Sequence, residues 1–315
     1  MAKAVADTNG GSNQGGFQSD DGIITGFSGM HDSGTGGSPS LGLFPLFPHA
    51  SCAGDDVNGC AYPKTVRAEG YDKASVKARP GYFGLTLNGG VSADMTASQH
   101  ASLFRFRFPD AASPLLQLDL TDLSDSRQDN GTISVDPATG RMTGNARFVP
   151  SFAQGSYVAY FCADFKGAPI RDGGVYVNTR ASTDVHQLTI TRSINGYPLP
   201  GGGFFRFQAS GAAEIMARVG VSLISSQQAC ASAENEIPGW DFDGVRKTAE
   251  AAWREKLSPI TLTTTGVDHS LVTNFYSGIY RTMVNPQDYT GENPLWKSDE
   301  PYFDSFYWYV ALLSR

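Results

Sequence analysis

The chain has 315 residues, enough for two ordinary domains or for one large β-sandwich followed by a smaller unit. Only 17% of its residues are charged, and 36 glycines and 17 prolines mark a turn-rich globular protein. The 24 basic and 31 acidic residues give a net charge of −7, which excludes the basic surface that nucleic acid or an anionic membrane requires. We therefore expect neither as a partner.

The beginning of the chain carries no apolar segment of the kind used for membrane insertion or secretion. No run of about 18 apolar residues occurs anywhere, which excludes a transmembrane helix. The opening residues 1–7 lack the apolar core of a signal peptide. Residues 1 to about 60 are rich in glycine, serine and asparagine, and we expect irregular structure there.

Cys52 and Cys60 enclose a short polar loop that contains Asp55, Asp56 and Asn58. A disulfide closes such a loop easily in an oxidising compartment, and two free thiols are the alternative. A zinc site is a poor interpretation, because no pair of histidines or cysteines stands at ligand spacing beside the loop.

From Tyr82 onward, apolar residues recur at every second position, which predicts strands with one buried face. Asn88-Gly89 indicates a hairpin within this region. The alternation places two sets of side chains on buried faces: Phe104, Phe106 and Phe108, and then Leu116, Leu118 and Leu120. The opposite, exposed faces would carry Arg105 and Arg107, and then Gln117 and Asp119. Further strands are expected at 132–135, 141–148, 157–161, 204–207 and 215–222. Turns every 8–15 residues or so, with no helical pattern between them, favour a sandwich of two antiparallel sheets.

The pattern changes near Pro238. Apolar residues then recur every four positions behind Asp243, a candidate N-cap, and Ser258-Pro259 ends this first helix. A second helix follows Asp268, with Leu271, Phe275 and Ile279 on one stripe, and is expected to end at Asn285-Pro286. We predict a mainly β domain over 1–238 and a helical segment over 239–315.

Residues 26–37 gather His31, Asp32 and Ser33 in a glycine-rich loop. The glycine spacing is not that of a phosphate-binding loop, and Met30 stands where a nucleophile elbow after Ser28 needs glycine. An imidazole, a carboxylate and hydroxyls together suit hydrogen bonding to a sugar. A purely structural turn is the alternative.

Residues 289–307 interleave carboxylates with aromatic rings, a mixture found in carbohydrate enzymes and also in ordinary helix-entry loops. The carboxylates of this stretch are those of Glu292, Asp299, Glu300 and Asp304. The sequence does not show which of them would act as acid and which as base, because their pKa values depend on burial and neighbours. The remaining histidines lack a partner pattern and are interpreted as structural: His49, His100, His186 and His269.

Taken together, these stretches resemble glycoside hydrolase family 92. The resemblance is carried by Gly26-Phe27-Ser28, His31-Asp32-Ser33-Gly34-Thr35-Gly36, Thr290-Gly291-Glu292-Asn293-Pro294-Leu295-Trp296 and Tyr302-Phe303-Asp304-Ser305-Phe306-Tyr307. Fungal members in particular are similar in residues 1–7, in Phe44-Pro45-Leu46-Phe47-Pro48 and in 76–83. The resemblance covers nearly the whole chain up to Tyr307.

This resemblance implies a calcium-dependent, exo-acting α-mannosidase that works with inversion on mannose-containing glycans. It implies an N-terminal β-sandwich, linker helices and the truncated start of an (α/α)6 barrel, with the active site between sandwich and barrel. Sugar contacts are then expected at His31, Asp32, Ser33 and Asp304.

The chain departs from the family pattern in three respects. Gly29 stands where members usually carry a second histidine. After Tyr307 the family expects a Trp-Asp dipeptide whose aspartate contacts mannose, whereas residues 308–315 read WYVALLSR. The acid, the base and most calcium ligands of the family belong to barrel segments beyond residue 315. The sequence therefore predicts a fragment of an α-mannosidase that is inactive alone and whose full-length form is secreted. The alternatives are a non-catalytic carbohydrate-binding or structural β-sandwich module, and a non-functional gene product.

Overall fold

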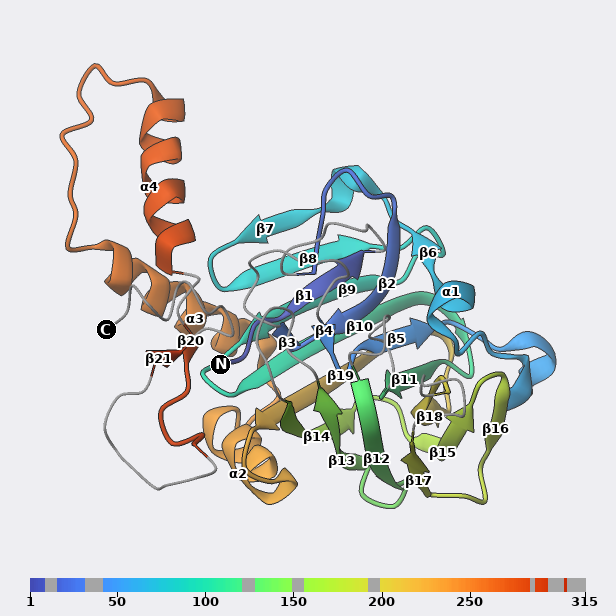
Figure 1. Ribbon diagram of the computed structural model, residues 1–315. Helices are drawn as coiled ribbons and strands as arrows, with labels where there is room; N and C mark the ends of the chain where they lie inside the picture. Colours follow the sequence, from blue (N-terminus) through green and yellow to red (C-terminus); the bar gives the residue numbers. More distant parts are fainter. Residues whose placement is uncertain are drawn as a thin grey trace.

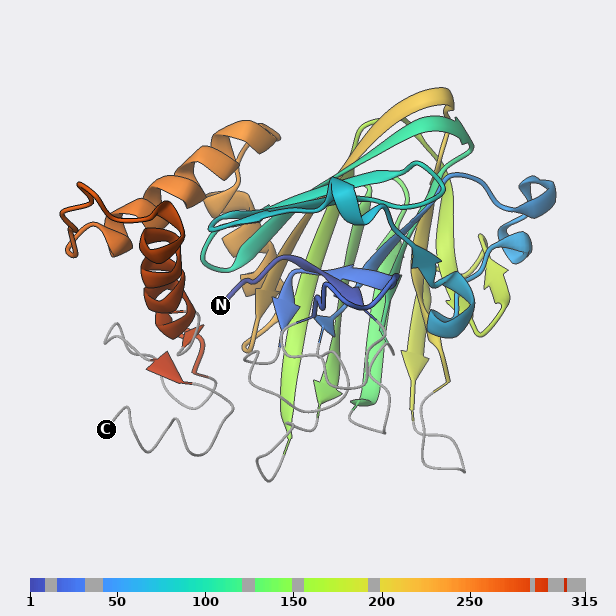
Figure 2. The same ribbon diagram turned by 90° about the horizontal axis from the view of Figure 1, so that it is seen from above.

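Two antiparallel sheets pack face to face, and helices gather at one end of the sandwich (Figure 1). The view in Figure 2 shows α3 and α4, in orange, projecting from one side of the sandwich. This computed structural model describes residues 1–8, 16–31, 42–120, 128–148, 156–191, 199–283, 287–293 and 303–304.

The larger sheet has nine strands in the order β17-β12-β13-β14-β19-β10-β9-β8-β7. Their bounds are Gln187–Ile190, Gln128–Asp136, Arg141–Phe148, Tyr157–Lys166, Ser210–Ser222, Ala101–Ala112, Ser92–Ala97, Tyr82–Thr86 and Lys77–Arg79. The longest strand, β19, lies at its centre between β14 and β10.

The smaller sheet has the order β1-β2-β5-β11-β18-β15-β16, and β6 pairs with β2 beside this path. Their bounds are Val5–Thr8, Ile23–Ser28, Leu46–His49, Leu115–Asp119, Gly201–Phe207, Ile170–Val177, Arg180–Ser182 and, for β6, Glu69–Gly70. Two short ladders accompany the sheets: β3 (Met30–His31) with β4 (Gly42–Leu43), and β20 (Gln287–Asp288) with β21 (Phe303–Asp304).

The period-two pattern of β10 was a correct guide to the core. Phe104, Phe106 and Phe108 are at most 1% exposed, and the ring of Phe106 lies 5.5 Å from that of Phe27 in the opposite sheet. On the outer face, Arg105 and Arg107 both bond to the carboxylate of Asp94 on β9. The mainly β, antiparallel architecture predicted from the sequence is confirmed.

The prediction that one face of β11 is exposed is wrong. Gln117 and Asp119 are 0% and 2% exposed, as buried as their leucine neighbours. The segment after β5 folds back over this face of the sheet and supplies polar partners. The carboxamide of Gln117 bonds to His49 and to the carbonyl of Tyr62, and Asp119 forms a buried ion pair with Arg67 of α1 (Lys64–Arg67).

The expectation of irregular structure up to about residue 60 is also wrong for the described part of that region. β1, β2 and β5 form there and complete one side of the smaller sheet. In β2 the five residues from Ile24 to Ser28 are all buried. The strand therefore lacks the alternation of buried and exposed residues by which half-buried strands are recognised.

Three longer helices follow the sandwich: α2 (Ser226–Glu236), α3 (Phe242–Leu257) and α4 (His269–Met283). α3 ends before Ser258 as predicted, but its N-cap is Asp241, whose carboxylate accepts a hydrogen bond from Gly244 N. Asp243, the predicted N-cap, lies in the first turn and pairs with Arg246 instead. α4 begins directly after Asp268, as expected, whereas its predicted end at Asn285-Pro286 lies outside the described residues.

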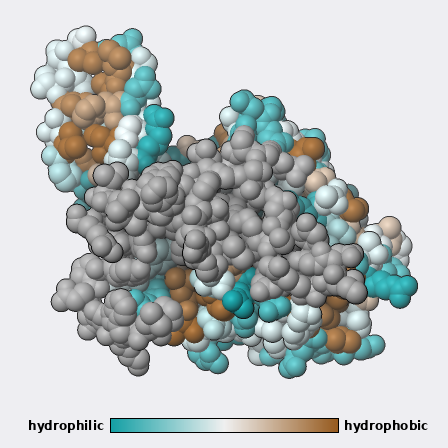
Figure 3. Space-filling view, in the orientation of Figure 1, coloured by the Kyte–Doolittle hydropathy of each residue, from teal (hydrophilic) through white to brown (hydrophobic). Residues whose placement is uncertain are grey.

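The apolar stripe of α4 faces outward. Leu271 and Phe275 are 61% and 42% exposed, and Ile279 is half-buried. Figure 3 shows the corresponding apolar patch on this helix.

α2 packs on the outer face of the larger sheet through small residues. An added Cβ at Gly220 of β19 would overlap the backbone of Ala229, so only glycine allows this close approach. A disulfide between Cys162 of β14 and Cys230 of α2 fixes the same contact.

We expect removal of this disulfide by a Cys162→Ala/Cys230→Ala double substitution to lower the free energy of unfolding by about 2–4 kcal/mol. Urea denaturation under non-reducing conditions measures the loss. The matched control is Cys52→Ala/Cys60→Ala, which opens a loop of sequence separation 8 instead of 68 and should cost less. An equal or smaller loss for the first pair would contradict the role given to the α2 contact.

Candidate functional site

His31 lies at the centre of a buried hydrogen-bond network between the first strands. Its Nδ1 lies 2.9 Å from the carbonyl oxygen of Lys3, and its Nε2 lies 2.8 Å from Oδ1 of Asp7. The second carboxylate oxygen of Asp7 accepts a hydrogen bond of 2.5 Å from Ser28 Oγ. His31, Asp7 and Ser28 are each at most 1% exposed.

The electrostatics of this network favour an ionised Asp7. Burial by itself raises the pKa of its carboxyl, but the charge and hydrogen bond of His31 and the hydrogen bond from Ser28 outweigh burial, so the pKa lies below its ordinary value. Both ring nitrogens of His31 face oxygen atoms, one from the Lys3 carbonyl and one from the Asp7 carboxylate.

The network is not a nucleophile triad, although it contains serine, histidine and aspartate. A triad places the histidine between the other two so that it accepts the serine proton. Here Asp7 stands in the middle, and Ser28 donates to a carboxylate that is already paired. The network therefore orients the β2–β3 segment, and a direct bond from His31 to a sugar would replace one of the two bonds it makes here.

Two glycines shape the surroundings of His31. Gly16 has a φ of +99°, and a side chain there would run into the imidazole ring. An added Cβ at Gly29 would lie 2.9 Å from Ser102 Oγ of β10, whose hydroxyl donates to the Gly29 carbonyl. A histidine at position 29, as the family usually has, would require Ser102 to move.

The second predicted stretch is anchored to the sandwich by Glu292. This side chain is 2% exposed. Its Oε2 accepts hydrogen bonds from Ser222 Oγ at 2.7 Å and from Leu223 N at 2.6 Å, and its Oε1 accepts one from Gln228 Nε2 at 2.7 Å. This carboxylate, held by three donors in the interior, joins residues 287–293 to the end of β19 and the start of α2.

The other predicted site residues stand as follows. Asp32, Ser33, Asp299 and Glu300 lie outside the described residues. Asp304 is described through its backbone alone, which pairs with Gln287 in the β20–β21 ladder. The sugar contacts expected at His31, Asp32, Ser33 and Asp304 stay predictions.

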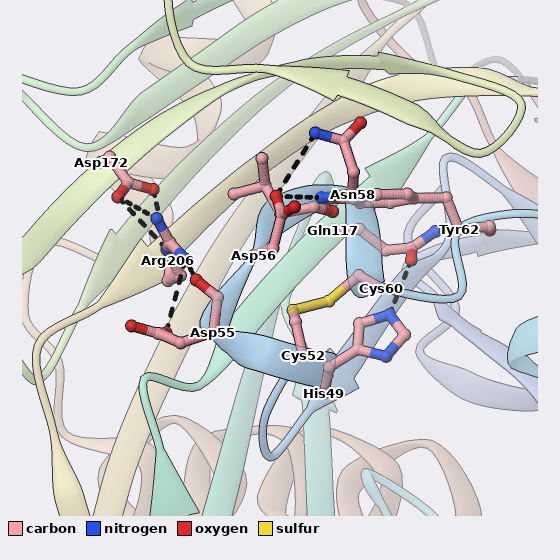
Figure 4. The surroundings of a disulfide bond; sticks show 11 residues. His49, Cys52, Asp55, Asp56, Asn58, Cys60, Tyr62, Gln117, Asp172 and Arg206 are labelled. Atoms are coloured by element: carbon pink, nitrogen blue, oxygen red, sulfur yellow. Dashed lines mark hydrogen bonds and ion pairs between the residues drawn. A yellow bond between two sulfur atoms is a disulfide. The ribbon is translucent and has the colours of Figure 1, made fainter.

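Cys52 and Cys60 form a disulfide that closes the predicted polar loop (Figure 4). Asp55 of this loop pairs with Arg171 and Arg206 on the neighbouring strands, and Tyr62, just after it, stacks on Tyr176 with ring centroids 4.3 Å apart. Burial lowers the pKa of the adjacent His49 to about 4, so this imidazole is neutral at pH 7. The loop is a structural cover for the outer face of β11 and β18.

His100 joins α2 to the β9–β10 turn. Its Nδ1 lies 2.6 Å from Oε1 of Glu236, whose Oε2 accepts from Ser98 Oγ and from the His100 backbone N–H. His269 begins α4, and His186 is exposed before β17.

Within the described residues, no three histidine, cysteine or carboxylate side chains converge into a group that could hold a metal ion. Among the helices of the described part, none is long and apolar enough to cross a membrane.

Comparison with known proteins identifies the family. The model of the glycosyl hydrolase family 92 N-terminal domain matches residues 1–222, and that of the family 92 catalytic domain matches residues 228–312. The chain belongs to glycosyl hydrolase family 92. The predicted division at residue 238 stays a prediction, but the two models follow one another along the chain.

A curated relative described as an uncharacterized secreted glycosidase, from Arthroderma benhamiae, is 50% identical over 98% of this chain. The chain spans 41% of that relative's length.

Solved structures of the family share the fold. The family 92 glycosyl hydrolase ccman5 superposes with a TM-score of 0.78 at 21% identity, over 97% of this chain and 41% of its own. The inverting mannosidase BT2199 from Bacteroides thetaiotaomicron gives a TM-score of 0.70 at 20% identity, over 91% of this chain and 37% of its own.

The sequence did not reveal the partners of His31. Asp7 and Ser28 lie 24 and 3 positions from it, in β1 and β2, and the pairing of these two strands brings both residues to one network. Cys162 and Cys230 are 68 positions apart, so spacing gave no signal for their disulfide. Helical or strand periodicity reports burial, and these contacts are decided by which strands become neighbours.

We expect Asp7→Ala to lower the free energy of unfolding by about 3 kcal/mol at pH 6, because it leaves His31 buried without its carboxylate. Since the folded pKa of Asp7 lies below its ordinary value of 3.8, its contribution is complete above that pH and is lost as the pH falls through the folded value. Urea denaturation of both proteins from pH 6 to 3 should therefore show the difference shrinking at the acid end. A difference that grows on acidification would contradict the assignment.

We expect Glu292→Gln to loosen residues 287–293, because the amide group must turn its NH2 toward at least one donor that the carboxylate now accepts. The free energy of unfolding should fall by about 2 kcal/mol, and hydrogen exchange at Leu223 N–H should quicken. Glu255→Gln on the exposed face of α3 is the control and should stay within about 0.5 kcal/mol of the unchanged protein. Unaltered exchange at Leu223 would show that the anchor is not needed.

Proposed function

We propose that this chain is the N-terminal part of an exo-acting α-mannosidase that removes terminal α-mannose from glycoproteins and N-glycans with inversion. The observation that carries the proposal is that models of both family domains match it in order, 1–222 and then 228–312. Further support comes from a neighbour of the same fold that is an inverting mannosidase. The partners of the full-length protein are then mannose-containing glycans.

Inversion requires two carboxyl groups about 6.5–9.5 Å apart, one to protonate the leaving oxygen and one to activate water on the opposite face of the sugar. Two of the described carboxylates are already held by hydrogen bonds: Asp7 by His31 and Ser28, and Glu292 by groups at the end of β19. We assign the chain the sugar-facing wall formed by His31, Asp32, Ser33 and Asp304. The catalytic acid and base come from elsewhere in the full-length protein, and the chain alone has negligible turnover.

Calcium belongs to the proposal only through the family resemblance. A bound Ca2+ would supply a Lewis acid that orients sugar hydroxyls. We assign no calcium ligand to this part of the chain.

Secretion of the full-length protein is also proposed. Two disulfides join all four cysteines, and disulfides persist in oxidising compartments. The related fungal glycosidase is described as secreted.

The decisive experiment joins this chain to the rest of a relative. In the Arthroderma benhamiae glycosidase, the segment that matches residues 1–307 is replaced by those residues, so that everything beyond the position of Tyr307 is the relative's own. We expect the hybrid, like the intact relative, to release mannose from α-1,2-mannobiose, with β-mannose as the first anomer seen by NMR and with loss of activity in chelator. The separate 315-residue chain should release none.

An intact relative that is active together with a folded but inactive hybrid would overturn the assignment of the sugar-facing wall. Chelator-sensitive mannose release by the separate chain would overturn its predicted inactivity, and α-mannose as the first product would overturn inversion. If instead the separate chain binds mannose or mannobiose through His31 and Asp32 in calorimetric titration, the alternative of a non-catalytic sugar-binding module is favoured.

A further inference from the structure

The outer face of the larger sheet carries a groove that is lined by none of the residues of the His31 network. It has a volume of about 440 Å³ and crosses β17, β12, β13 and β14 up to the first turn of α2. Figure 1 shows these four strands side by side with α2 along their border. Every residue that lines the groove lies in the described part of the chain.

Strand register arranges the groove side chains in two rows. Thr189, Thr132, Asn145 and Tyr160 are successive cross-strand partners and form one row. Gln187, Ser134 and Thr143 form the second. Directly paired residues project to the same face of a sheet, and four strands span about 14 Å. The groove thus presents two parallel lines of polar groups with an aromatic ring at the end nearest α2.

The chemistry of the lining is neutral. Nine of its twelve residues carry a hydroxyl or a carboxamide, and none carries a charge. The nearest charges stand beside the groove: Arg141, two residues before Thr143 on β13, pairs with Asp164 of β14 and with Glu234 of α2. These flanking charges therefore neutralise one another. An ionic ligand would find no unpaired counter-charge here, and the apolar centre typical of a protein interface is missing from this lining.

Several of these groups are held in place. Asn145 Nδ2 donates to Thr132 Oγ1 at 2.9 Å, which fixes the carboxamide along the row. Ser226 Oγ donates to the Gly144 carbonyl at 3.0 Å and ties the α2 wall to the floor. The Cys162–Cys230 disulfide ties α2 to β14, the strand next to β13. Prepositioned neutral donors and acceptors lose little conformational freedom when they exchange water for sugar hydroxyls.

We propose that this groove binds a neutral oligosaccharide, with a sugar ring against Tyr160 and hydroxyl groups along the rows of Thr132, Asn145, Ser134 and Thr143. Hydroxyl and amide groups provide both donors and acceptors, as a polyol requires, and an aromatic ring offers a face for its C–H groups. This binding site goes beyond the proposed function, because it needs neither the catalytic carboxylates nor calcium. It would hold a glycan of the substrate while another branch is processed.

The test is a calorimetric or NMR titration of the 315-residue protein with α-linked mannotriose. We expect a dissociation constant of about 1 mM. Tyr160→Ala should weaken binding about tenfold, whereas Tyr160→Phe, which keeps the ring, should stay within about twofold. Asn145→Ala should weaken it about fivefold. Thr65→Ala on the exposed surface of α1 is the control and should change nothing.

Three results would overturn the proposal: no binding at about 10 mM mannotriose, binding by the Tyr160→Ala and Asn145→Ala proteins as tight as that of the unchanged protein, or stronger binding of a sulfated trisaccharide than of neutral mannotriose. The unfolding midpoint of each variant is measured as well, so that weaker binding caused by unfolding is distinguished from weaker binding caused by loss of a contact with the sugar. The outcome is independent of mannose release by the hybrid enzyme, and failure of one does not imply failure of the other.

Discussion

The arrangement of this protein depends on the burial of β19 on both of its faces. Its inner residues, among them Ile215 and Ala217, close the core between the sheets, while on the outer face Gly220 lies against α2. Arg218 is 8% exposed and is neutralised by Asp164. The strand ends at Ser222, the residue that donates to Glu292. One strand thus fixes the core, the first helix after the sandwich, and the segment that carries the second family motif.

Local sequence patterns predicted the structure correctly where one face of an element is buried and the other is exposed to solvent. β10 is the clear example, because Phe104, Phe106 and Phe108 alternate with arginines that reach the surface. The same reasoning failed for Gln117 and Asp119, which look like exposed positions but are covered by the segment between β5 and β6. No local pattern predicts that these side chains are covered, because their partners Arg67 and Tyr62 lie more than 50 positions away in the sequence.

Small residues explain why α2 escaped prediction. Its buried positions are Ala229 and Ala233, and these give no apolar stripe. The helix can lie close to the sheet for that very reason, since an alanine face against Gly220 brings two backbones together. The candidate site shows the same limit. The motif around His31 was recognisable, but its hydrogen bonds are made to Asp7 and to the Lys3 carbonyl, and no local pattern pairs these residues with His31.

The Cys162–Cys230 bond has a consequence for how the family's two domains stay together. Cys162 belongs to the segment that matches the N-terminal domain, and Cys230 to the segment that matches the catalytic domain. The peptide that connects the two matches, residues 223–227, is therefore not their sole covalent link. A protease in an extracellular environment could cut that connection and leave sandwich and helices as one two-chain molecule. Reduction of the disulfide would then remove the last covalent link and leave only the non-covalent contacts of α2 and Glu292 with the sandwich.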